Sequence, residues 1–365
     1  MRPSPPRRAI KGLAVLGVGL SAVLGHMSWP AAAEAGTPKI LAHRGIHQTY
    51  DREGLTRDAC TATRIHAPTH PFLENTLPSM AAAFAAGADV LELDVHPTTD
   101  GEFAVFHDWT LECRTEGTGV TRHHTMAHLK TLDVGWGYTA DGGATFPFRG
   151  KGVGLMPTLA EVLRAFPDRR FLVNIKSRDP TEGERLVRYL RDRDLPTDER
   201  LWVFGHDAPA EGVLRLAPGA RVMTRARGKE CAWRYLVLGW SGAVPEACRG
   251  AMIGVPLNLR HLYWGWPDRF LSRMREADVE VMILGPVRLI GETGAPGFVH
   301  VEQLDAVPDA FAGYVLTDNI EVIGPEALRR WPGKRASSQP AASSGPAAVL
   351  APASGVGSGT RAAGP

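Results

Sequence analysis

The sequence has almost no excess of charge of either sign. Its 41 lysine and arginine residues balance 39 acidic residues, which gives a formal net charge of +2 at pH 7. This balance disfavours a nucleic-acid partner, because such binding relies on a clustered basic face. The sequence also lacks a glycine-rich nucleotide loop, a zinc-type pair of cysteines and a Gly-x-Ser-x-Gly turn. Nothing in it implies a stable protein partner.

The apolar run near the N-terminus is short. Basic residues precede it, it covers residues 13–24, and mostly small residues follow at 31–35. A membrane-spanning helix needs about 20 apolar residues, whereas this pattern is typical of an export signal. We therefore predict that residues 1–36 are a signal peptide and that the cleaved protein is secreted or extracytoplasmic.

The four cysteines are few and far apart in the sequence. In an exported protein they indicate disulfides rather than a metal site, because none lies in the close pairs that bind zinc. Three pairings are possible. We favour Cys231 with Cys248, which closes a short loop, and Cys60 with Cys113, which joins two segments that each follow a predicted strand.

Beyond about Trp331 the sequence is rich in Pro, Ala, Ser and Gly and has almost no large apolar residues. Such a composition cannot bury enough apolar surface to form a core. We predict a disordered tail over residues 332–365, with a linker that associates with a cell wall as the alternative. Residues 37–331 are then left for the folded part.

Nine short apolar runs lie in residues 37–331, most of them separated by helical stretches. The runs cover residues 39–43, 90–95, 103–107, 171–176, 201–206, 221–225, 252–257, 280–284 and 314–317. Too few residues separate the second and third runs for the crossover that parallel strands need, so these two runs predict a hairpin. The eight remaining β/α units predict a (β/α)8 barrel of the TIM type. The long segment 108–171 predicts a small insertion over the carboxyl-end mouth.

Within the predicted hairpin, strand alternation places Glu92 and Asp94 on one face of the sheet. Asp100-Gly101 is a strong turn signal. If residues whose numbers sum to about 199 face each other across this turn, His107 lies opposite Glu92. The hairpin alone therefore predicts a small cluster of two carboxylates and a histidine.

Polar residues also stand at the ends of the other predicted strands. These residues are His43, Arg44, Asn174, Lys176, His206, Asp207, Thr317, Asp318 and Asn319. The carboxyl ends of barrel strands meet at one face, where the active sites of such barrels lie. A histidine beside an arginine at this face favours a phosphate site, because a guanidinium matches two phosphate oxygens at once.

Six short motifs in this order resemble the glycerophosphodiester phosphodiesterase family. They are His43-Arg44-Gly45, Glu74-Asn75-Thr76, Glu92-Leu93-Asp94, His107-Asp108, Asn174-Ile175-Lys176 and Thr317-Asp318-Asn319. The resemblance runs from about Ile40 to Pro325. It implies a barrel fold and a divalent metal ion, Ca²⁺ or Mg²⁺.

The resemblance also implies roles for individual residues. His43 and His107 are expected to be the catalytic acid and base, and Glu92 and Asp94 to hold the metal. Asn174 stands where the family usually has a third acidic metal ligand. Its amide oxygen can coordinate a metal but brings no charge, so we expect weaker metal binding.

Arg44 and Lys176 are expected to hold the substrate phosphate. Glu74 is expected to touch the substrate or to orient His43 and Arg44, and its alternative is an acid that only stabilises a helix N-terminus. Asp179 or Glu74 could complete the metal shell in place of Asn174.

These residues predict a metal-dependent hydrolase that releases glycerol 3-phosphate and an alcohol from glycerophosphodiesters. Deacylated phospholipid headgroups are the first expected substrate, and glycerol phosphate polymers of a cell wall are the second. One alternative is a phospholipase D-like lyase that acts on lysolipids and forms a cyclic phosphate. The other is a catalytically weak protein that only binds phosphoryl ligands.

Overall fold

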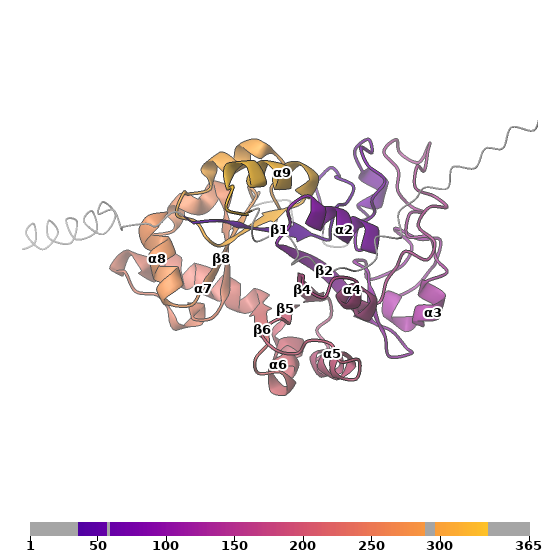
Figure 1. The fold of residues 1–365 in the computed structure, drawn as a ribbon, viewed down its shortest axis with the longest axis horizontal. Coiled ribbons are helices and arrows are strands. Elements are labelled where there is room, and N and C mark those ends of the chain that lie inside the picture. The colour runs from indigo at the N-terminus through magenta and orange to yellow at the C-terminus, as the bar shows by residue number, and fades with distance from the viewer. Residues whose placement is uncertain (1–35, 57–58, 289–295, 335–365) are drawn as a thin grey trace, which may run out of the picture.

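The structure is a computed structural model that describes residues 36–56, 59–288 and 296–334 (Figure 1). The expected signal peptide, apart from residue 36, and the expected tail beyond residue 334 lie outside the described residues. Within the described ranges, no helix is both long and apolar enough to cross a membrane.

Eight parallel strands form a nearly closed barrel, which confirms the predicted fold class. Hydrogen-bonded pairing follows the order β6-β5-β4-β2-β1-β9-β8-β7, and β3 pairs with β2 beside this path. The strands are β1 (Lys39–His43), β2 (Val90–Pro97), β3 (Phe103–Val105), β4 (Arg170–Ile175), β5 (Trp202–Gly205), β6 (Arg221–Thr224), β7 (Met252–Pro256), β8 (Glu280–Leu284) and β9 (Tyr314–Thr317). Each of the nine predicted runs therefore forms a strand.

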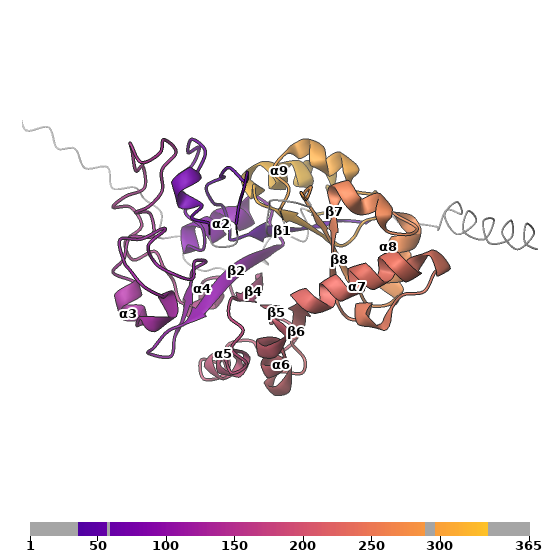
Figure 2. The same ribbon diagram turned by 180° about the vertical axis from the view of Figure 1, so that it is seen from behind.

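Helices surround the strands on the outside of the barrel, as the two opposite views show (Figures 1 and 2). The α-helices are α2 (Leu77–Ala85), α3 (Met126–Leu129), α4 (Leu159–Ala165), α5 (Glu182–Arg191), α6 (Asp207–Leu216), α7 (Arg225–Leu238), α8 (Asp268–Glu276) and α9 (Ile320–Arg330). Short 3₁₀ turns are η1 (Ala62–Arg64), η2 (Thr121–His123), η3 (Gly239–Ser241), η4 (Glu246–Cys248), η5 (Leu257–Leu262) and η6 (Val301–Ala306).

Strand alternation divides the apolar residues of β2 between two cores. Leu91, Leu93 and Val95 pack in the large core that the outer helices share. Val90 packs in a separate cluster to which the neighbouring strands contribute one or two residues each. Glu92 and Asp94 have the same parity as Val90, so they lie on the inner side of the barrel.

The hairpin of β2 and β3 has a different register from the predicted one. Val95 pairs with Val105 and Pro97 with Phe103, so the numbers of facing residues sum to 200. An even sum means that the turn is centred on one residue, Asp100, and not on a pair. β3 ends at Val105, so His107 lies beyond the ladder and the prediction that it faces Glu92 was wrong.

The segment between β3 and β4 forms a small subdomain at the carboxyl end of the hairpin. Residues from 104 to 156 share a buried apolar cluster with Ala62, Ile65 and Leu73 from the segment that follows β1. Two insertions that lie far apart in the sequence therefore pack together, and α3 belongs to this unit (Figure 1).

Both favoured disulfides are present. Cys60 is bonded to Cys113 across 53 residues, and Cys231 is bonded to Cys248 across 17 residues. The first disulfide ties the two insertions together, and the second joins α7 to η4.

Removal of the Cys60–Cys113 disulfide is expected to destabilise the protein more than removal of the Cys231–Cys248 disulfide. The chain-entropy model gives about 4 kcal/mol for the longer loop and about 3 kcal/mol for the shorter one, because a longer closed loop restricts the unfolded chain more. Urea unfolding of the paired Cys→Ser variants measures both values. Equal losses, or a larger loss at Cys231–Cys248, would contradict this order.

The described chain continues past the expected domain boundary at Trp331. The Lys334 side chain is only 1% exposed and forms an ion pair with Asp89, which precedes β2. The packed part of the chain therefore reaches at least Lys334, three residues into the region predicted as a disordered tail.

Candidate active site

Four neighbouring strands bring the predicted site residues to the carboxyl-end mouth of the barrel. β4, β2, β1 and β9 are adjacent in the sheet. In register, His43 is the partner of Glu92, and Asp94 is the partner of Asn174. Asp318 directly follows β9. Parallel pairing thus assembles residues that are up to 275 positions apart in the sequence.

His43 is oriented by Asp318. Its Nδ1 lies 2.7 Å from Asp318 Oδ1, and its Nε2 lies 3.8 Å from Glu92 Oε2. Burial raises the pKa of Asp318, but the hydrogen bond and charge of His43 hold that pKa well below its usual range. An ionised carboxylate can only accept, so Nδ1 carries the proton and Nε2 points into the site.

Asp318→Asn is expected to lower kcat about 10²-fold or more while KM changes little. Asp318 holds Nδ1 of His43 and so fixes the tautomer and orientation of the ring, and loss of such a positioning carboxylate impairs proton transfer. Steady-state kinetics with a glycerophosphodiester separate the two constants. An increase in KM with unchanged kcat would show that Asp318 acts on binding and not on His43.

His107 is held by a second carboxylate. Its Nδ1 donates to Asp108 Oδ1 at 2.7 Å, and Asp108 in turn forms an ion pair with Arg114. Burial, together with the positive charges of Arg44 and Lys176, lowers the pKa of His107 to about 4. His107 is therefore neutral at pH 7, with its proton on Nδ1.

Glu92 and Asp94 lie side by side, and their pKa values are shifted in opposite directions. Burial and the charge of Asp94 raise the pKa of Glu92. Burial also acts on Asp94, but Lys176, His107, Arg44 and His43 lower its pKa well below the usual range. Contacts link both rings to this pair of carboxylates. His43 Nε2 lies 3.8 Å from Glu92 Oε2. Asp108, the partner of His107, is joined through Arg114 and Glu74 to Arg44, which lies beside Asp94.

The predicted phosphate-binding cations are also paired with this carboxylate. Lys176 Nζ lies 3.2 Å from Asp94 Oδ1, and Arg44 Nε lies 3.3 Å from Asp94 Oδ2. Arg44 has a left-handed backbone with φ of 60°. Gly45 follows at φ of 82°, and a Cβ there would lie 2.3 Å from Ser79 Oγ. The tight turn after β1 thus needs glycine, and it positions Arg44 in the site.

Glu74 joins the two arginines of the site. Its carboxylate lies 3.2 Å from Arg44 Nη1 and 3.0 Å from Arg114 Nη2. The helix that follows is capped by the Thr76 side chain, so Glu74 is not the cap itself. Of the two alternatives for Glu74, these contacts favour the one in which it orients Arg44.

Burial raises the pKa of Glu74, but the charges of Arg114 and Arg44 outweigh burial and lower the pKa to about 2. Glu74 therefore stabilises the fold above the unfolded-state pKa, and this contribution is lost as the pH falls towards 2. We expect the difference in unfolding free energy between the wild type and Glu74→Gln to shrink over this window. Urea unfolding at several acidic pH values measures this difference. A difference that stays constant with pH would contradict a lowered pKa of Glu74.

Arg114 and Asn75 in the site, and His47 beside it, were given no role from the sequence. Arg114 contacts both Asp108 and Glu74, and it is brought there by the disulfide of Cys113. Asn75 donates through Nδ2 to Asp94 Oδ2 at 3.3 Å. His47 lies beside His43 and Asp318. Asn75 lies inside the Glu74-Asn75-Thr76 motif, and His47 lies two residues after the His43-Arg44-Gly45 motif. These positions were the signals that could have found them.

One oxygen atom in the set Glu92, Asp94 and Asn174 is suited to a divalent cation. Glu92 Oε2 is buried and has no hydrogen-bond partner among the described residues, and a buried carboxylate oxygen of this kind suits a hard cation. Asn174 Nδ2 donates to Glu92 Oε1 at 2.9 Å and to Asp94 Oδ1 at 3.0 Å. To act as a ligand, Asn174 would have to turn its amide so that the oxygen faces the carboxylates.

The alternative third ligands are engaged elsewhere. Asp179 accepts hydrogen bonds from the backbone and the hydroxyl of Thr181 at the start of α5, and Glu74 is paired with two arginines. His96, whose parity matches Glu92 and Asp94, is buried and contacts the backbone carbonyl of His107 at 3.5 Å. It therefore supports His107.

A family model for the glycerophosphoryl diester phosphodiesterase family matches residues 43–201. These residues belong to that family. The matched range contains every predicted site residue from His43 to Lys176, and it ends before β5.

Two curated relatives are named glycerophosphodiester phosphodiesterases. The chain is 30% identical over 154 residues to one from Caldanaerobacter subterraneus, a match that covers 41% of this chain and 59% of that protein. It is 36% identical over 128 residues to one from Bacillus subtilis, with coverage of 33% and 42%. The chain therefore matches only about half the length of these relatives.

Solved structures extend the similarity to the whole barrel. A glycerophosphodiester phosphodiesterase from Agrobacterium tumefaciens has a TM-score of 0.51 and 21% identity, and the match covers 79% of this chain and 99% of that one. A glycerophosphoryl diester phosphodiesterase domain from Mycobacterium tuberculosis has a TM-score of 0.56 and 20% identity, with coverage of 80% and 99%. These matches support the barrel fold.

Proposed function

We propose that the chain hydrolyses glycerophosphodiesters to glycerol 3-phosphate and an alcohol by two-histidine acid–base catalysis. The observation that carries this proposal is a connected set of contacts: Arg44 and Lys176 lie beside Asp94, His43 lies beside Glu92, and ion pairs run from Arg44 through Glu74, Arg114 and Asp108 to His107. Two proton-transfer groups and two fixed cations around one centre suit the cleavage of an anionic phosphodiester.

His107 is suited to act as the base. Its lowered pKa of about 4 keeps the ring neutral at pH 7, and Asp108 holds its proton on Nδ1, so the Nε2 lone pair can accept a proton. His43 then serves as the acid, because Asp318, 2.7 Å from Nδ1, orients the ring so that Nε2 faces the site. Nε2 of His43 can pass a proton to the leaving alkoxide.

Arg44 and Lys176 bind and orient the phosphate. In the structure they neutralise Asp94, and a phosphoryl group that enters between them would share these charges. A guanidinium with two donors can grip two nonbridging oxygens, while the ammonium acts as a compact charge.

Ca²⁺ or Mg²⁺ is part of the proposal. Glu92 and Asp94 would hold it, with Asn174 as a neutral third ligand, and it would supply positive charge to the nonbridging oxygens. Such hard cations prefer oxygen ligands, which all three side chains can offer. The missing third carboxylate predicts weaker binding than a site with three acids.

The chain is proposed to act outside the cytoplasm on deacylated phospholipid headgroups, with wall polymers of glycerol phosphate as the second substrate class. Two disulfides are typical of an oxidising compartment. The N-terminal export pattern supports the same location.

The test is incubation with glycerophosphocholine and Ca²⁺ or Mg²⁺. We expect release of glycerol 3-phosphate that stops on addition of a chelator and returns when the metal is restored. A cyclic phosphate as the final product would favour the lyase alternative, and phosphate binding without turnover would favour the binding protein. Full activity in a His43→Ala/His107→Ala double variant would rule out the mechanism.

A further inference from the structure

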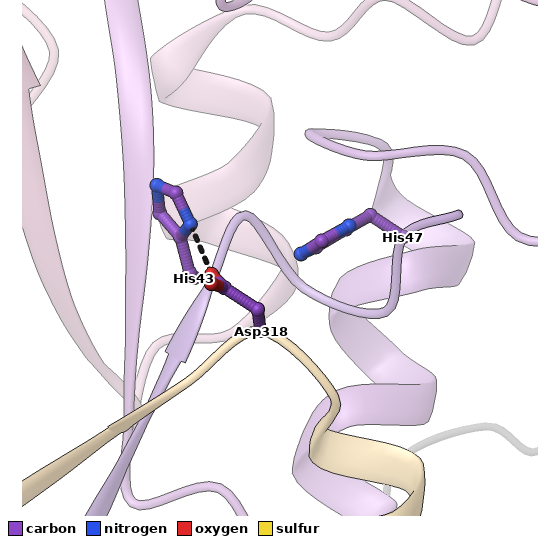
Figure 3. Close-up of side chains that lie close together, drawn as sticks. All are labelled: His43, His47 and Asp318. Carbon is purple, nitrogen blue, oxygen red and sulfur yellow. Dashed lines mark hydrogen bonds and ion pairs between the residues drawn. The ribbon is translucent and has the colours of Figure 1, made fainter. Parts of the chain in front are cut away.

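His43, His47 and Asp318 form a second cluster of metal-binding groups, next to the carboxylates Glu92 and Asp94. Their ligand atoms all lie within 4.8 Å of one another. The three side chains come from the end of β1, from the loop that follows it and from the end of β9, and they converge on one point (Figure 3).

The donor atom of His47 is available for a ligand. His47 is 3% exposed, and its Nδ1 donates to the Gln48 backbone oxygen at 3.1 Å. The lone pair of the neutral ring is therefore on Nε2, which is buried and has no hydrogen-bond partner among the described residues. Figure 3 shows a ring nitrogen of His47 directed toward Asp318. An acceptor that is buried without a donor calls for a cation or a proton donor.

The chemistry of this cluster differs from that of the carboxylate site. Two imidazoles and one carboxylate suit Zn²⁺ and similar transition-metal ions, whereas an all-oxygen set suits Ca²⁺ and Mg²⁺. Burial lowers the pKa of His47, which keeps its ring neutral and able to coordinate.

Only small movements are needed to close the site. Ligand atoms of a tetrahedral zinc ion lie roughly 3.3–3.5 Å apart, so a spread of at most 4.8 Å closes by a shift of about 1 Å. The hydrogen bond of 2.7 Å between His43 and Asp318 would open, and the metal would take the place of its proton. The ion pair between Arg52 and Asp318, in which Nη1 lies 3.7 Å from Oδ2, would weaken.

We propose that His43, His47 and Asp318 bind a Zn²⁺-like ion and that its binding inhibits the enzyme through the tautomer of His43. A proton on Nδ1 is present when the His43 ring acts as a base, and it is also present when the doubly protonated ring acts as an acid. A metal at Nδ1 forces the neutral ring to carry its proton on Nε2. In that form Nε2 can neither accept a proton nor donate one readily.

The two parts of this inference can fail separately. Binding of the metal depends only on the three side chains, while inhibition rests on the proposed function. Binding is therefore measured without reference to activity, with Co²⁺ as a probe whose visible absorption reports its ligands, and with Zn²⁺ by calorimetry. Saturating Ca²⁺ is present throughout, so that Glu92 and Asp94 are not available to the probe.

His47→Gln is the decisive variant, because His47 has no place in the proposed catalysis. We expect the wild type to bind one Zn²⁺. When this site is filled, the activity is expected to fall at least about tenfold. His47→Gln is expected to bind Zn²⁺ about 10–100-fold more weakly, to keep its activity without Zn²⁺, and to resist inhibition. His66→Gln, at an exposed histidine of the same segment, is the matched control and should behave as the wild type. His47→Phe keeps a ring of similar size and checks that the result does not come from misfolding.

Equal Zn²⁺ affinity in the wild type and both His47 variants would overturn the site. No binding by the wild type, or the same loss in His66→Gln, would overturn it as well. Binding that depends on His47 but leaves the activity unchanged would overturn the inhibition alone. If no phosphodiesterase activity is found, the Co²⁺ absorption still decides whether the metal site exists.

Discussion

Replacement of His107 by alanine is expected to lower kcat for glycerophosphodiester hydrolysis by about 10²–10⁴-fold, the usual contribution of a general acid or base. His107 is half-buried, neutral at pH 7 and held by Asp108 at 2.7 Å, with its pKa lowered to about 4. A small change in KM is expected, because Arg44 and Lys176 remain to hold the phosphate.

Steady-state kinetics of purified His107→Ala measure this loss, and His123→Ala is the control because His123 is exposed in the insertion. The double variant with His43→Ala should lose little more than the worse single variant, since residues that act as one unit are not additive. A loss confined to KM would show that His107 binds substrate without transferring a proton.

Replacement of Arg114 by methionine is expected to destabilise the fold by about 3–5 kcal/mol, as removal of one partner from a buried ion pair usually does. The Arg114 side chain is 2% exposed and is paired with Asp108 and with Glu74. It also donates to Thr61 at 2.7 Å and to Tyr138 at 3.1 Å. Its loss leaves Asp108 without its cation and leaves Glu74 paired with Arg44 alone.

Urea unfolding of Arg114→Met should show a lower midpoint, and kcat should fall as well because Asp108 loses the residue that fixes it. Arg200→Met is the control, since the Arg200–Asp198 pair is exposed and exposed pairs contribute little. An unchanged midpoint in Arg114→Met would mean that the carboxylates find other partners.

The barrel could be predicted from the sequence because its signals are local. Each apolar run is bounded by polar or glycine-containing segments, and each forms a strand. The hairpin between β2 and β3 was also predicted, but its register was not, because the turn is closed by Thr98 and Glu102 around Asp100. A turn with an odd number of residues shifts every facing pair by one.

The predicted site residues do come together, since the carboxyl ends of adjacent parallel strands must meet. The contacts that tune them depend on long-range packing and could not be predicted. Asp318 reaches His43 across 275 residues, and Arg114 reaches Glu74 across 40. The orientation of the Asn174 amide depends on Arg225, whose Nη2 donates to Asn174 Oδ1 at 3.4 Å.

Phosphorus NMR of the products from glycerophosphocholine shows whether His43 and His107 together cleave a phosphodiester. We expect a glycerol 3-phosphate signal that grows with the wild type in the presence of Ca²⁺ or Mg²⁺ and is absent with the His43→Ala/His107→Ala protein. An unchanged diester signal with the metal-loaded wild type, or equal product from the double variant, would contradict this expectation.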